Sequence, residues 1–518
     1  MHDVGLAQEI EIKLEASPAA LERLEASGWF GRHADAKRRE QQRSVYFDTP
    51  ALDLRDDGVA LRVRQIGQRR VQTVKAAQPA QPLARQESER ELESDAPDLR
   101  RARGAERRVT KKQKRRLSPV FETRVERTIL PLRRQGAELE IAIDRGEIRA
   151  GKNVEPISEI EVELKGGDLG ALVQMARALG DEFEVRYSVR SKAERGYALF
   201  EEAPAKASRA EDIELAKSTR VAAGFQLIGL ACLRHFVLNE QALQRGDAEG
   251  VHQMRVGLRR LRAAISLFEE LVFDDETAQL KGELRWLISQ LGPVRDLDVL
   301  MAEGLAPLKA EARHEAALAK LESALHERRQ EQLALARSAV ASDRCRKLVL
   351  QLALWLLAGN WTRASSERLQ RLRERRLRSF ARRALARRTT KVGKRLRKLE
   401  LLDEHQRHEL RIAVKKLHYA AEFFATLFPR SARRRQRYVE LLKELQDGLG
   451  RLNDIHVHTA LARELVQPAP ETAAPMSGRE EAFAMGLLMG SERAEARALL
   501  KATARTGVRV ANFPAFWR

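Results

Sequence analysis

The sequence predicts two parts, an α+β N-terminal domain dominated by antiparallel strands and an all-α C-terminal domain. Before about residue 203, apolar residues recur in several segments with a period of two, which is typical of strands that bury one face. Beyond residue 217 they recur with helical periodicity, in segments rich in Ala, Leu, Arg and Glu. Within this second part, a segment that begins at His252 is repeated from His408.

The strands of the N-terminal domain are indicated by alternating charged and apolar residues. The clearest stretches are 9–13, 59–64, 138–144 and 159–165. Short helices are expected between strands near 18–27 and 168–180. A small, polar segment with one proline follows at 204–217 and predicts a linker. We therefore place the N-terminal domain at residues 1–203.

The all-α domain, residues 218–518, contains an internal duplication. The segment 252–269 aligns without gaps on 408–425, and LGPVRDLDVL at 291–300 aligns on LGRLNDIHVH at 449–458. Two similar units therefore follow each other, at 218–360 and 361–518. This duplication predicts two helical bundles related by a pseudo-twofold axis.

The charge balance predicts a polyanionic partner. The chain has 95 Lys and Arg against 74 Asp and Glu, a net charge of +21, which suits nucleic acid, anionic lipid or a phosphate polymer alike. With only Cys232 and Cys345, a disulfide framework or a four-cysteine zinc site is excluded. The sequence shows neither a signal peptide nor ~20 consecutive apolar residues. We expect a soluble, cytoplasmic protein with no membrane partner.

Acidic and basic residues share faces of the predicted strands. Because alternate residues of a strand point the same way, Glu9, Glu11 and Lys13 lie on one face. The same pattern recurs on other strands at Arg62, Arg64, Lys75, Arg85, Arg127, Glu140, Asp144, Glu159, Glu161, Glu163 and Lys165. Inside a closed sheet, such carboxylates would hold divalent metal ions, and the Arg and Lys side chains would bind phosphate oxygens. The alternative is that each face is the solvated side of an ordinary sheet, and periodicity alone does not decide.

Several motifs of the N-terminal domain resemble the CYTH, or triphosphate-tunnel, family. The resemblance begins with EIEIK at 9–13 and extends, in order, over nearly all of residues 7–200. The further motifs are SVYFDTPALDLRDDGVALRVR (44–64), TVKA (73–76), RQESE (85–89), AIDRGEI (142–148), EIEVELKGG (159–167) and SKAERGY (191–197).

The CYTH resemblance implies an eight-stranded antiparallel tunnel that binds a triphosphate and requires Mg²⁺ or Mn²⁺. By position, it implies a catalytic role for Glu9, Glu11 and Lys13. The metal ligands it implies are Glu9, Glu11, Asp144, Glu159, Glu161 and Glu163. The phosphate-binding residues it implies are Arg62, Arg64, Lys75, Arg85, Arg127 and Lys192. Strand parity favours Arg124 over Arg127, because Arg124 shares its face with Glu122 and Glu126; Arg127 rests on the resemblance alone.

Two helices of the all-α domain carry basic stripes at matching positions of the duplication. At ~100° per residue, His252, Arg255, Arg259 and Arg262 fall on one side of their helix. The second unit repeats the stripe with His408, Arg411, Lys415 and His418. Facing each other, the two stripes would form a basic channel for phosphate oxygens. The alternative is that each stripe is simply a solvated helix face. The repeated spacing, together with the matching positions of Asp296 and Asp454, argues against this alternative.

This second part resembles the CHAD family, conserved-histidine α-helical domains, over roughly 218–518. The matching segments are VHQMRVGLRRLR, LGPVRDLDVL, HELRIAVKKLHY and LGRLNDIHVH. The resemblance implies two four-helix bundles around a basic cavity that binds inorganic polyphosphate. Arg260 and Lys416 are further candidates that project outside the stripes.

Together these observations favour a metal-dependent inorganic triphosphatase that also binds long-chain polyphosphate. Alternatives are a nucleoside or thiamine triphosphatase, an adenylyl cyclase of the same barrel family, and a non-catalytic polyphosphate scaffold or granule protein. A specific nucleic-acid partner is disfavoured because aromatic residues make up only 5% and are scarce in the stripes. The sequence leaves the oligomeric state open.

Overall fold

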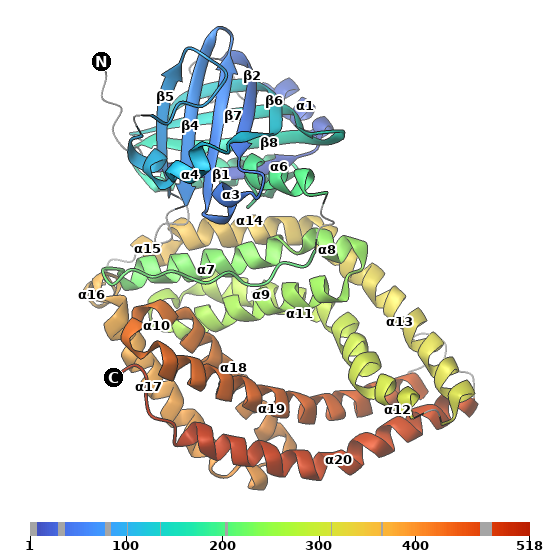
Figure 1. The fold of residues 1–518 in the computed structure, drawn as a ribbon. Helices are drawn as coiled ribbons and strands as arrows, with labels where there is room; N and C mark the ends of the chain where they lie inside the picture. Colours follow the sequence, from blue (N-terminus) through green and yellow to red (C-terminus); the bar gives the residue numbers. More distant parts are fainter. Residues whose placement is uncertain are drawn as a thin grey trace. The chain divides into compact units, whose positions relative to one another are not determined.

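The computed structural model describes residues 8–29, 37–77, 84–100, 102–134, 136–202, 206–311, 313–363, 366–466 and 479–518 (Figure 1). Over these residues the chain divides into two compact units, each assembled from several segments. The first unit comprises Met1–Ser208, Leu233–Gln241 and Ser342–Ala364, and the second comprises Arg209–Cys232, Ala242–Ala341 and Ser365–Arg518. The linear boundary near 203 and the linker at 204–217 stay predictions.

The first unit is built on an antiparallel sheet of nine described strands in the order β5-β4-β3-β2-β6-β7-β8-β1-β9. Their bounds are β1 Gln8–Ala16, β2 Arg38–Asp48, β3 Val59–Ile66, β4 Arg69–Ala77, β5 Ala84–Leu92, β6 Ser118–Arg134, β7 Ala137–Ala150, β8 Asn153–Gly166 and β9 Val185–Tyr187. The expected number of eight strands is therefore wrong, because the short β9 is added beyond β1.

The sheet curls round so that its two ends meet at β1. This strand pairs with β8 over Ile10–Glu15 and with β5 over three residue pairs, Gln8–Ile10 against Ala84–Gln86. Because the seam between the described residues is this short, the described sheet does not close along its full length. The fold is an antiparallel sheet wrapped around an interior, and not a continuously hydrogen-bonded barrel.

The period-two pattern reflects a charged interior and a buried exterior of this sheet. On β1, Ile12 and Leu14 are almost fully buried, whereas Glu11 and Lys13 of the opposite parity line the internal cavity. The apolar residues therefore pack outwards. Of the two interpretations left open by the sequence, the charged lumen is confirmed for β1, and the solvated face is wrong.

Helices pack against the sheet of the first unit. α1 (Pro18–Ala26) and α5 (Leu169–Glu182) confirm the helices expected near 18–27 and 168–180. α14 (Asp343–Ala358) packs against α5. Its buried Arg346 donates from Nη1 to the carbonyl oxygens of Gly180 at 3.3 Å, Phe183 at 3.2 Å and Val185 at 2.9 Å. A single guanidinium thus ties a distant helix to the end of α5 and to β9.

The second unit is helical throughout its described residues, apart from loops and one isolated β-bridge. Its longer helices are α7 (Val221–Val237), α9 (Ala248–Leu267), α11 (Asp275–Val299), α13 (Glu315–Ala341), α17 (Leu377–Leu396), α18 (Glu404–Phe423), α19 (Ala432–Val466) and α20 (Arg479–Ala511). The last turn of α7, from Leu233, belongs to the first unit. Shorter helices of the second unit are α10 (Glu269–Val272), α12 (Ala306–Ala310) and α16 (Glu367–Glu374), while α8 (Glu240–Arg245) begins in the first unit and ends in the second. The first unit also contains the short helices α3 (Asp53–Asp56), α4 (Lys111–Lys114), α6 (Lys192–Phe200) and α15 (Asn360–Arg363).

The duplication seen in the sequence recurs at the level of helices. α9 and α18 have the same length and each begins after an aspartate N-cap, Asp247 and Asp403, whose side chain accepts a backbone N–H of the first turn. Their apolar faces are buried, as Leu258 and Leu261 are in α9 and Val414 and Leu417 in α18. The count of four helices in each predicted bundle stays a prediction.

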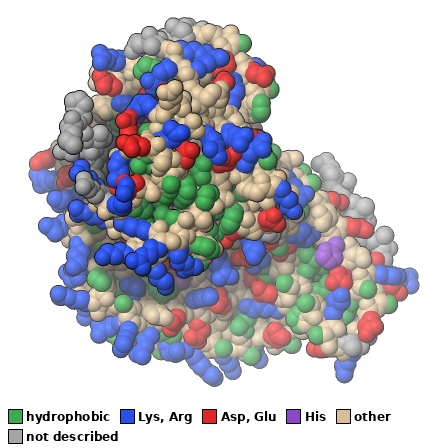
Figure 2. All heavy atoms as spheres, turned by 45° about the horizontal axis from the view of Figure 1, so that its top comes forward, with side chains coloured by type: hydrophobic (Ala, Val, Ile, Leu, Met, Phe, Trp, Pro, Cys, Tyr) green, Lys and Arg blue, Asp and Glu red, His purple; other side chains and the backbone are tan. Residues whose placement is uncertain are grey.

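One described stretch, Val221–Arg245, is long and apolar enough to cross a membrane, judged by length and composition. Phe225, Ile228 and Phe236 within it are completely buried. The stretch therefore has the burial of a core helix. On the face shown in Figure 2, Lys and Arg side chains are spread widely among acidic ones, in keeping with the net charge of +21.

Candidate active site and basic helical site

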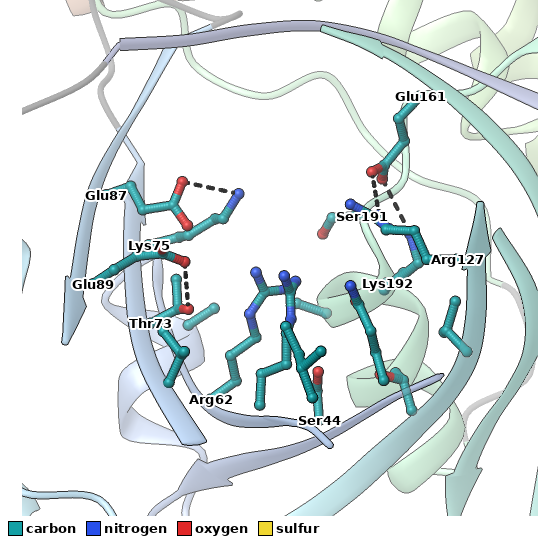
Figure 3. A pocket seen from close by; sticks show the side chains of 18 of the residues that line it. Ser44, Arg62, Thr73, Lys75, Glu87, Glu89, Arg127, Glu161, Ser191 and Lys192 are labelled. Atoms are coloured by element: carbon teal, nitrogen blue, oxygen red, sulfur yellow. Dashed lines mark hydrogen bonds and ion pairs between the residues drawn. The ribbon is translucent and has the colours of Figure 1, made fainter. Parts of the chain in front are cut away.

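The interior of the curled sheet holds a cavity of about 1270 Å³ (Figure 3). Strands on every side of it contribute charged side chains. Twelve of the residues singled out from the sequence line it, namely Glu11, Lys13, Arg62, Arg64, Lys75, Arg127, Glu140, Asp144, Glu161, Glu163, Lys165 and Lys192. The structure therefore brings most of the predicted site together.

One predicted residue, Glu159, is not part of the cavity lining, and for two others the structure does not describe the side chain. Glu159 is completely buried beside the lining residues Asp144 and Glu161, where it pairs with Lys192 and Arg195. Glu9 and Arg85 lie opposite each other on β1 and β5, but their side chains fall outside the described part of the structure.

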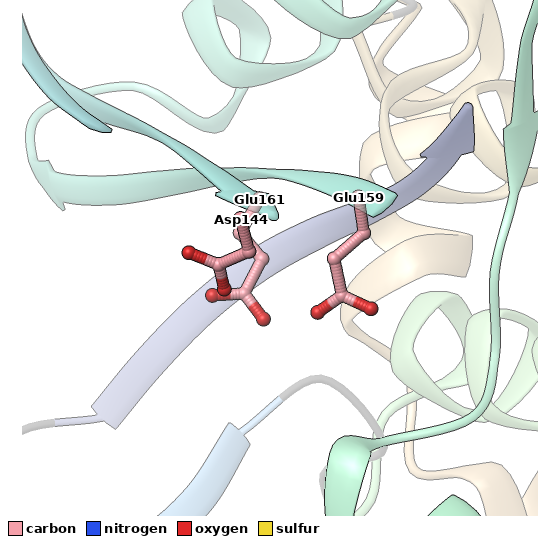
Figure 4. Close-up of side chains that lie close together, drawn as sticks. All are labelled: Asp144, Glu159 and Glu161. Atoms are coloured by element: carbon pink, nitrogen blue, oxygen red, sulfur yellow. The ribbon is translucent and has the colours of Figure 1, made fainter. Parts of the chain in front are cut away.

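Three carboxylates from β7 and β8 form the acidic centre of the lumen. Oxygens of Asp144, Glu159 and Glu161 all lie within 4.8 Å of one another (Figure 4). Register explains the grouping, because Asp144 is directly opposite Glu159 and Glu161 follows two residues later on the same face of β8. All three side chains are buried, so their negative charges need nearby cations.

Cations from three other elements surround this acidic centre. Lys192 Nζ is 2.7 Å from Asp144 Oδ2 and 3.1 Å from Glu161 Oε1, and it also contacts Glu159. Lys13 Nζ is 2.7 Å from Glu161 Oε1. Burial opposes the charging of Lys13, but Glu161, Glu11 and Glu159 outweigh it and raise the pKa of this lysine. Burial likewise opposes the ionisation of Glu161, but Lys13, Lys192 and Arg127 hold its pKa well below the usual range.

Arg127, and not Arg124, faces the lumen from β6. Its guanidinium donates to Asp144 Oδ1 at 2.7 Å and Oδ2 at 2.6 Å, and to Glu161 Oε2 at 2.6 Å. Arg124 is exposed on the outer surface and pairs with Glu122 at 2.7 Å. The preference drawn from parity was therefore wrong, because the outer face of β6 is itself lined with charges that pair with β2, as Glu122 does with Arg43.

A second acidic group lies across the lumen on β5. Figure 3 shows Glu87 and Glu89 on one side of the cavity and Glu161 on the other, with Arg62 and Lys192 between them. Glu87 is 3.3 Å from Lys75 Nζ, and Glu89 accepts a hydrogen bond from Thr73 at 3.0 Å. Acids therefore border the cavity on two sides of a cationic middle.

The cationic middle has unsatisfied donors. The buried Nε atoms of Arg62 and Arg64 have no hydrogen-bond partner among the described residues. Burial, with Arg62 and Arg127 close by, lowers the pKa of Arg64 to about 10. Buried donors without partners and uncompensated positive charge both favour an anion in this space.

Sequence reasoning missed two residues of this site. Tyr46 lines the cavity, stacks on Phe121 and places its hydroxyl 3.5 Å from Arg62 Nη1. Arg195, buried in α6, donates to Glu155, Glu159 and the carbonyl oxygen of Pro156. Arg195 could have been found, because it lies in the SKAERGY motif beside Lys192.

The predicted basic residues of the second unit separate into three groups. Arg255 and Arg259 of α9 lie near Arg411 and Lys415 of α18, and the three arginines add to the positive potential at Lys415. Burial, with Arg411 and Arg259 nearby, lowers the pKa of Lys415 to about 6. Burial, with Arg295 and Arg259 nearby, lowers the pKa of His252 to about 4. This first group brings together both predicted stripes.

The other two groups correct the predicted stripes. His418 lies near Glu422 and Arg260, and the buried Arg260 covers the ring of Phe423 at 5.5 Å. The exposed Arg262 and half-buried Lys416 lie near Arg388 of α17. His408 is exposed and bonds to Asn453 at 2.8 Å. The two predicted stripes therefore meet only through their middle residues.

Corresponding ion pairs occur in the two repeats of the duplication. Arg255 Nη2 is 3.8 Å from Asp296 Oδ1, and Arg411 Nη2 is 4.0 Å from Asp454 Oδ1. Asp296 and Asp454, which match in the duplication, therefore each lie beside an arginine of a predicted stripe. The Nη1 atom of Arg255 and the Nε atoms of Arg259 and Arg411 are buried without hydrogen-bond partners among the described residues.

Comparison with known families follows the same two parts. Residues 7–197 match the family model of the CYTH domain, and residues 228–463 match that of the CHAD domain. The chain carries a CYTH domain followed by a CHAD domain. The CYTH domain thus contains the lumen, and the CHAD domain contains the paired basic stripes.

Individual relatives resemble one domain or the other. The inorganic triphosphatase of Haemophilus influenzae is 31% identical over 198 residues, 38% of this chain and 55% of that protein, so the match spans about half of the relative. The crystal structure of the CHAD domain from the plant Ricinus communis overlaps 60% of this chain and 99% of its own, with 29% identity and a TM-score of 0.50. A Hippeastrum protein with a dominant triphosphatase activity overlaps 37% of this chain and 95% of its own, with 21% identity and a TM-score of 0.29.

The acidic centre of the CYTH domain has the donor chemistry of a divalent metal site. Carboxylate oxygens are the ligands that Mg²⁺ and Mn²⁺ prefer, and Asp144, Glu159 and Glu161 present them within 4.8 Å. Lys192 now contacts all three carboxylates. A bound cation would therefore share or replace the position of this ammonium group.

Proposed function

We propose that the CYTH domain hydrolyses inorganic triphosphate with the help of Mg²⁺ or Mn²⁺. One observation carries the proposal: a cavity of about 1270 Å³ inside the curled sheet is lined by buried cations with unsatisfied donors beside clustered carboxylates. A linear phosphate chain has the charge and the acceptor oxygens to satisfy these donors. The likeness to the Haemophilus influenzae inorganic triphosphatase supports the same substrate.

The residues of the lumen divide the work of the proposed reaction. Arg62, Arg64 and Lys75 bind the phosphate oxygens, and the curled sheet serves as the tunnel that excludes other ligands. Asp144, Glu159 and Glu161, with Glu11 and Glu163 at the rim, would hold the metal. When bound, it would neutralise phosphate charge and supply an acidified water. Arg127 and Lys13 keep the carboxylates ionised and oriented.

Substrate choice is tested by phosphate release from inorganic triphosphate, ATP and thiamine triphosphate at equal Mg²⁺. We expect inorganic triphosphate to have the highest kcat/KM, because Tyr46 is the only aromatic residue among the described side chains that line the cavity. An organic base would find little to stack on there. A higher kcat/KM for ATP or thiamine triphosphate would replace the substrate with an organic one, and no turnover at all would favour a non-catalytic scaffold.

For the CHAD domain we propose binding of long-chain inorganic polyphosphate. The supporting observation is the group of Arg255, Arg259, Arg411 and Lys415. Each arginine of the group has a buried donor without a partner among the described residues, and the positive charges of the group repel one another. A flexible polyanion relieves both. Competition between polyphosphate and RNA at fixed salt tests the choice, and preferential binding of RNA at ~0.15 M salt would contradict it. A cytoplasmic location, at polyphosphate granules in particular, belongs to the same proposal.

A further inference from the structure

The position of Lys192 depends on how helix α6 begins. Lys192 is the first residue of α6, and Ser191 is its N-cap. Ser191 forms a capping box with Glu194: Glu194 Oε2 accepts from Ser191 N at 2.7 Å and from Ser191 Oγ at 2.8 Å, while Glu194 N donates to Ser191 Oγ at 3.2 Å. The Glu194 carboxylate therefore fixes the backbone from which Lys192 enters the lumen.

A residue far away in the sequence holds this capping carboxylate. Arg234, in the last turn of α7, contacts Glu194 Oε1 through Nη2, and its Nη1 donates to the carbonyl oxygen of Val189 at 2.5 Å. One planar guanidinium thus grips both the capping residue and the chain just before the N-cap. All these residues belong to the first unit, but Arg234 lies beyond the CYTH match, which ends at residue 197.

We propose that Arg234 is a positioning residue, which acts through the capping box of Ser191 and Glu194 to set the place of the Lys192 ammonium in the lumen. The inference rests on the proposed triphosphatase function. Lys192 Nζ lies 2.7 Å from Asp144 and 3.1 Å from Glu161. A small shift of the helix start moves this ammonium away from both acids and from the phosphate path, and such misplacement can lower a rate by up to ~10²-fold.

The rest of α6 is anchored without Arg234. Arg195 bonds to Glu155, Glu159 and Pro156, and the Tyr197 hydroxyl donates to Asp48 at 2.9 Å. Loss of the Arg234 contacts therefore loosens the first turn and leaves the helix in place. The expected effect falls on catalysis more than on folding.

Three single variants and one double variant of the full chain test the proposal. Glu194→Gln keeps the capping box, because glutamine serves in the same motif, but it loses the charge that Arg234 contacts. We expect Arg234→Gln and Glu194→Gln each to lower kcat on inorganic triphosphate by roughly tenfold, and the double variant to lose no more than either one. Arg234→Lys keeps the charge and one donor, and it should retain most of the activity.

The matched control is Gln241→Ala, which removes a different contact of the same region. Gln241 accepts a hydrogen bond from Arg190 at 2.9 Å and does not touch the capping box. We expect its kcat to stay within about twofold of the wild type. An equal loss in Gln241→Ala would contradict the specific role of Arg234.

The decisive comparison uses Lys192→Met as the background. If Arg234 acts through Lys192, Arg234→Gln has no further effect on kcat there, whereas a general structural role would lower it again by the same factor.

Should the wild type show no turnover, the triphosphatase proposal itself fails. The same variants are then compared by calorimetric binding of metal-free inorganic triphosphate, where a roughly tenfold weaker Kd for Arg234→Gln supports positioning and an unchanged Kd overturns it.

Discussion

Arg127 shows how single residues decide the character of the lumen. Its two bonds to Asp144 and one to Glu161 keep a fully buried carboxylate ionised without leaving a charge unpaired. The sequence placed Arg127 and Arg124 on opposite faces of one strand, but alternation alone does not show which face is internal. Which face is internal became clear only from Glu122, which pairs with Arg43 and Arg124 on the outer surface.

Replacing Arg127 by lysine is therefore expected to be costly. Lysine keeps the charge but cannot bridge Asp144 and Glu161 with a planar fork. We expect kcat/KM on inorganic triphosphate to fall by about 10²-fold, while Arg124→Lys stays within about twofold of the wild type. Phosphate release measures both variants. Equal losses in the two would place Arg127 outside the reaction.

Lys415 gives the CHAD domain an expected pH dependence. Its pKa is about 6 in the folded chain and ~10.4 when unfolded. The unfolded state therefore binds more protons between these values, and this group makes the free energy of unfolding rise with pH across that window. A bound polyanion favours the charged form, so binding near pH 7.5 should take up a proton.

Calorimetry in two buffers of different ionisation enthalpy measures this proton uptake. We expect uptake in the wild type and clearly less in Lys415→Met. The same substitution should raise the free energy of unfolding at pH 7. At this pH the unfolded chain keeps the Lys415 side chain protonated, whereas its buried site in the folded chain disfavours the proton, and methionine removes this cost. Identical proton uptake in the two proteins would contradict the role assigned to Lys415.

At the scale of elements, helix α6 is the part of the CYTH domain that carries a cation into the acidic centre. Its start is visible in the sequence, since S-x-x-E at 191–194 is a capping box. The docking of α6 on the sheet is not visible in the sequence. It depends on the close packing of Gly196 against Phe121 of β6, which only the folded chain shows. The strands themselves were predictable by their alternation, whereas the added β9 spans only three residues and gave no pattern to detect.

Gly196→Ala tests this docking. A Cβ at Gly196 would lie 2.1 Å from Phe121 Cε2, so either the helix or the ring must move. We expect a loss of about 1–3 kcal/mol in the free energy of unfolding, together with a lower kcat as Lys192 shifts. Gly166→Ala, where nothing lies within 4 Å, is the matched control and should change stability by less than about 1 kcal/mol. Urea denaturation separates the two, and equal stabilities would argue against tight docking of α6.

At the scale of the whole molecule, the chain assembles its first unit from segments that the sequence separates widely. Hydrophobic periodicity predicted that residues 342–364 are helical, but it could not reveal their partner. That partner is set by Arg346, which bonds to three carbonyl oxygens near the end of α5 and in β9. The duplication of the CHAD domain, by contrast, was predictable, and it reappears as the matched pairs Arg255–Asp296 and Arg411–Asp454.

The two proposed activities are expected to be separable. In Arg255→Ala/Arg411→Ala, the basic group loses one cation from each repeat. We expect affinity for long-chain polyphosphate to fall by roughly tenfold or more, with a weaker dependence on salt, while turnover of inorganic triphosphate stays unchanged. Filter binding over a salt series and phosphate release provide the two readouts. Unchanged polyphosphate affinity would move the binding site elsewhere.

The central claim is that clustered carboxylates in the lumen support metal-dependent hydrolysis of inorganic triphosphate. Phosphate release by the wild type and by Glu161→Gln, each with Mg²⁺ and with excess chelator, tests it most directly. We predict Mg²⁺-dependent release by the wild type that chelation abolishes, and a loss of about 10²-fold in Glu161→Gln with circular dichroism unchanged. Release that survives both chelation and the Glu161 substitution would contradict the claim.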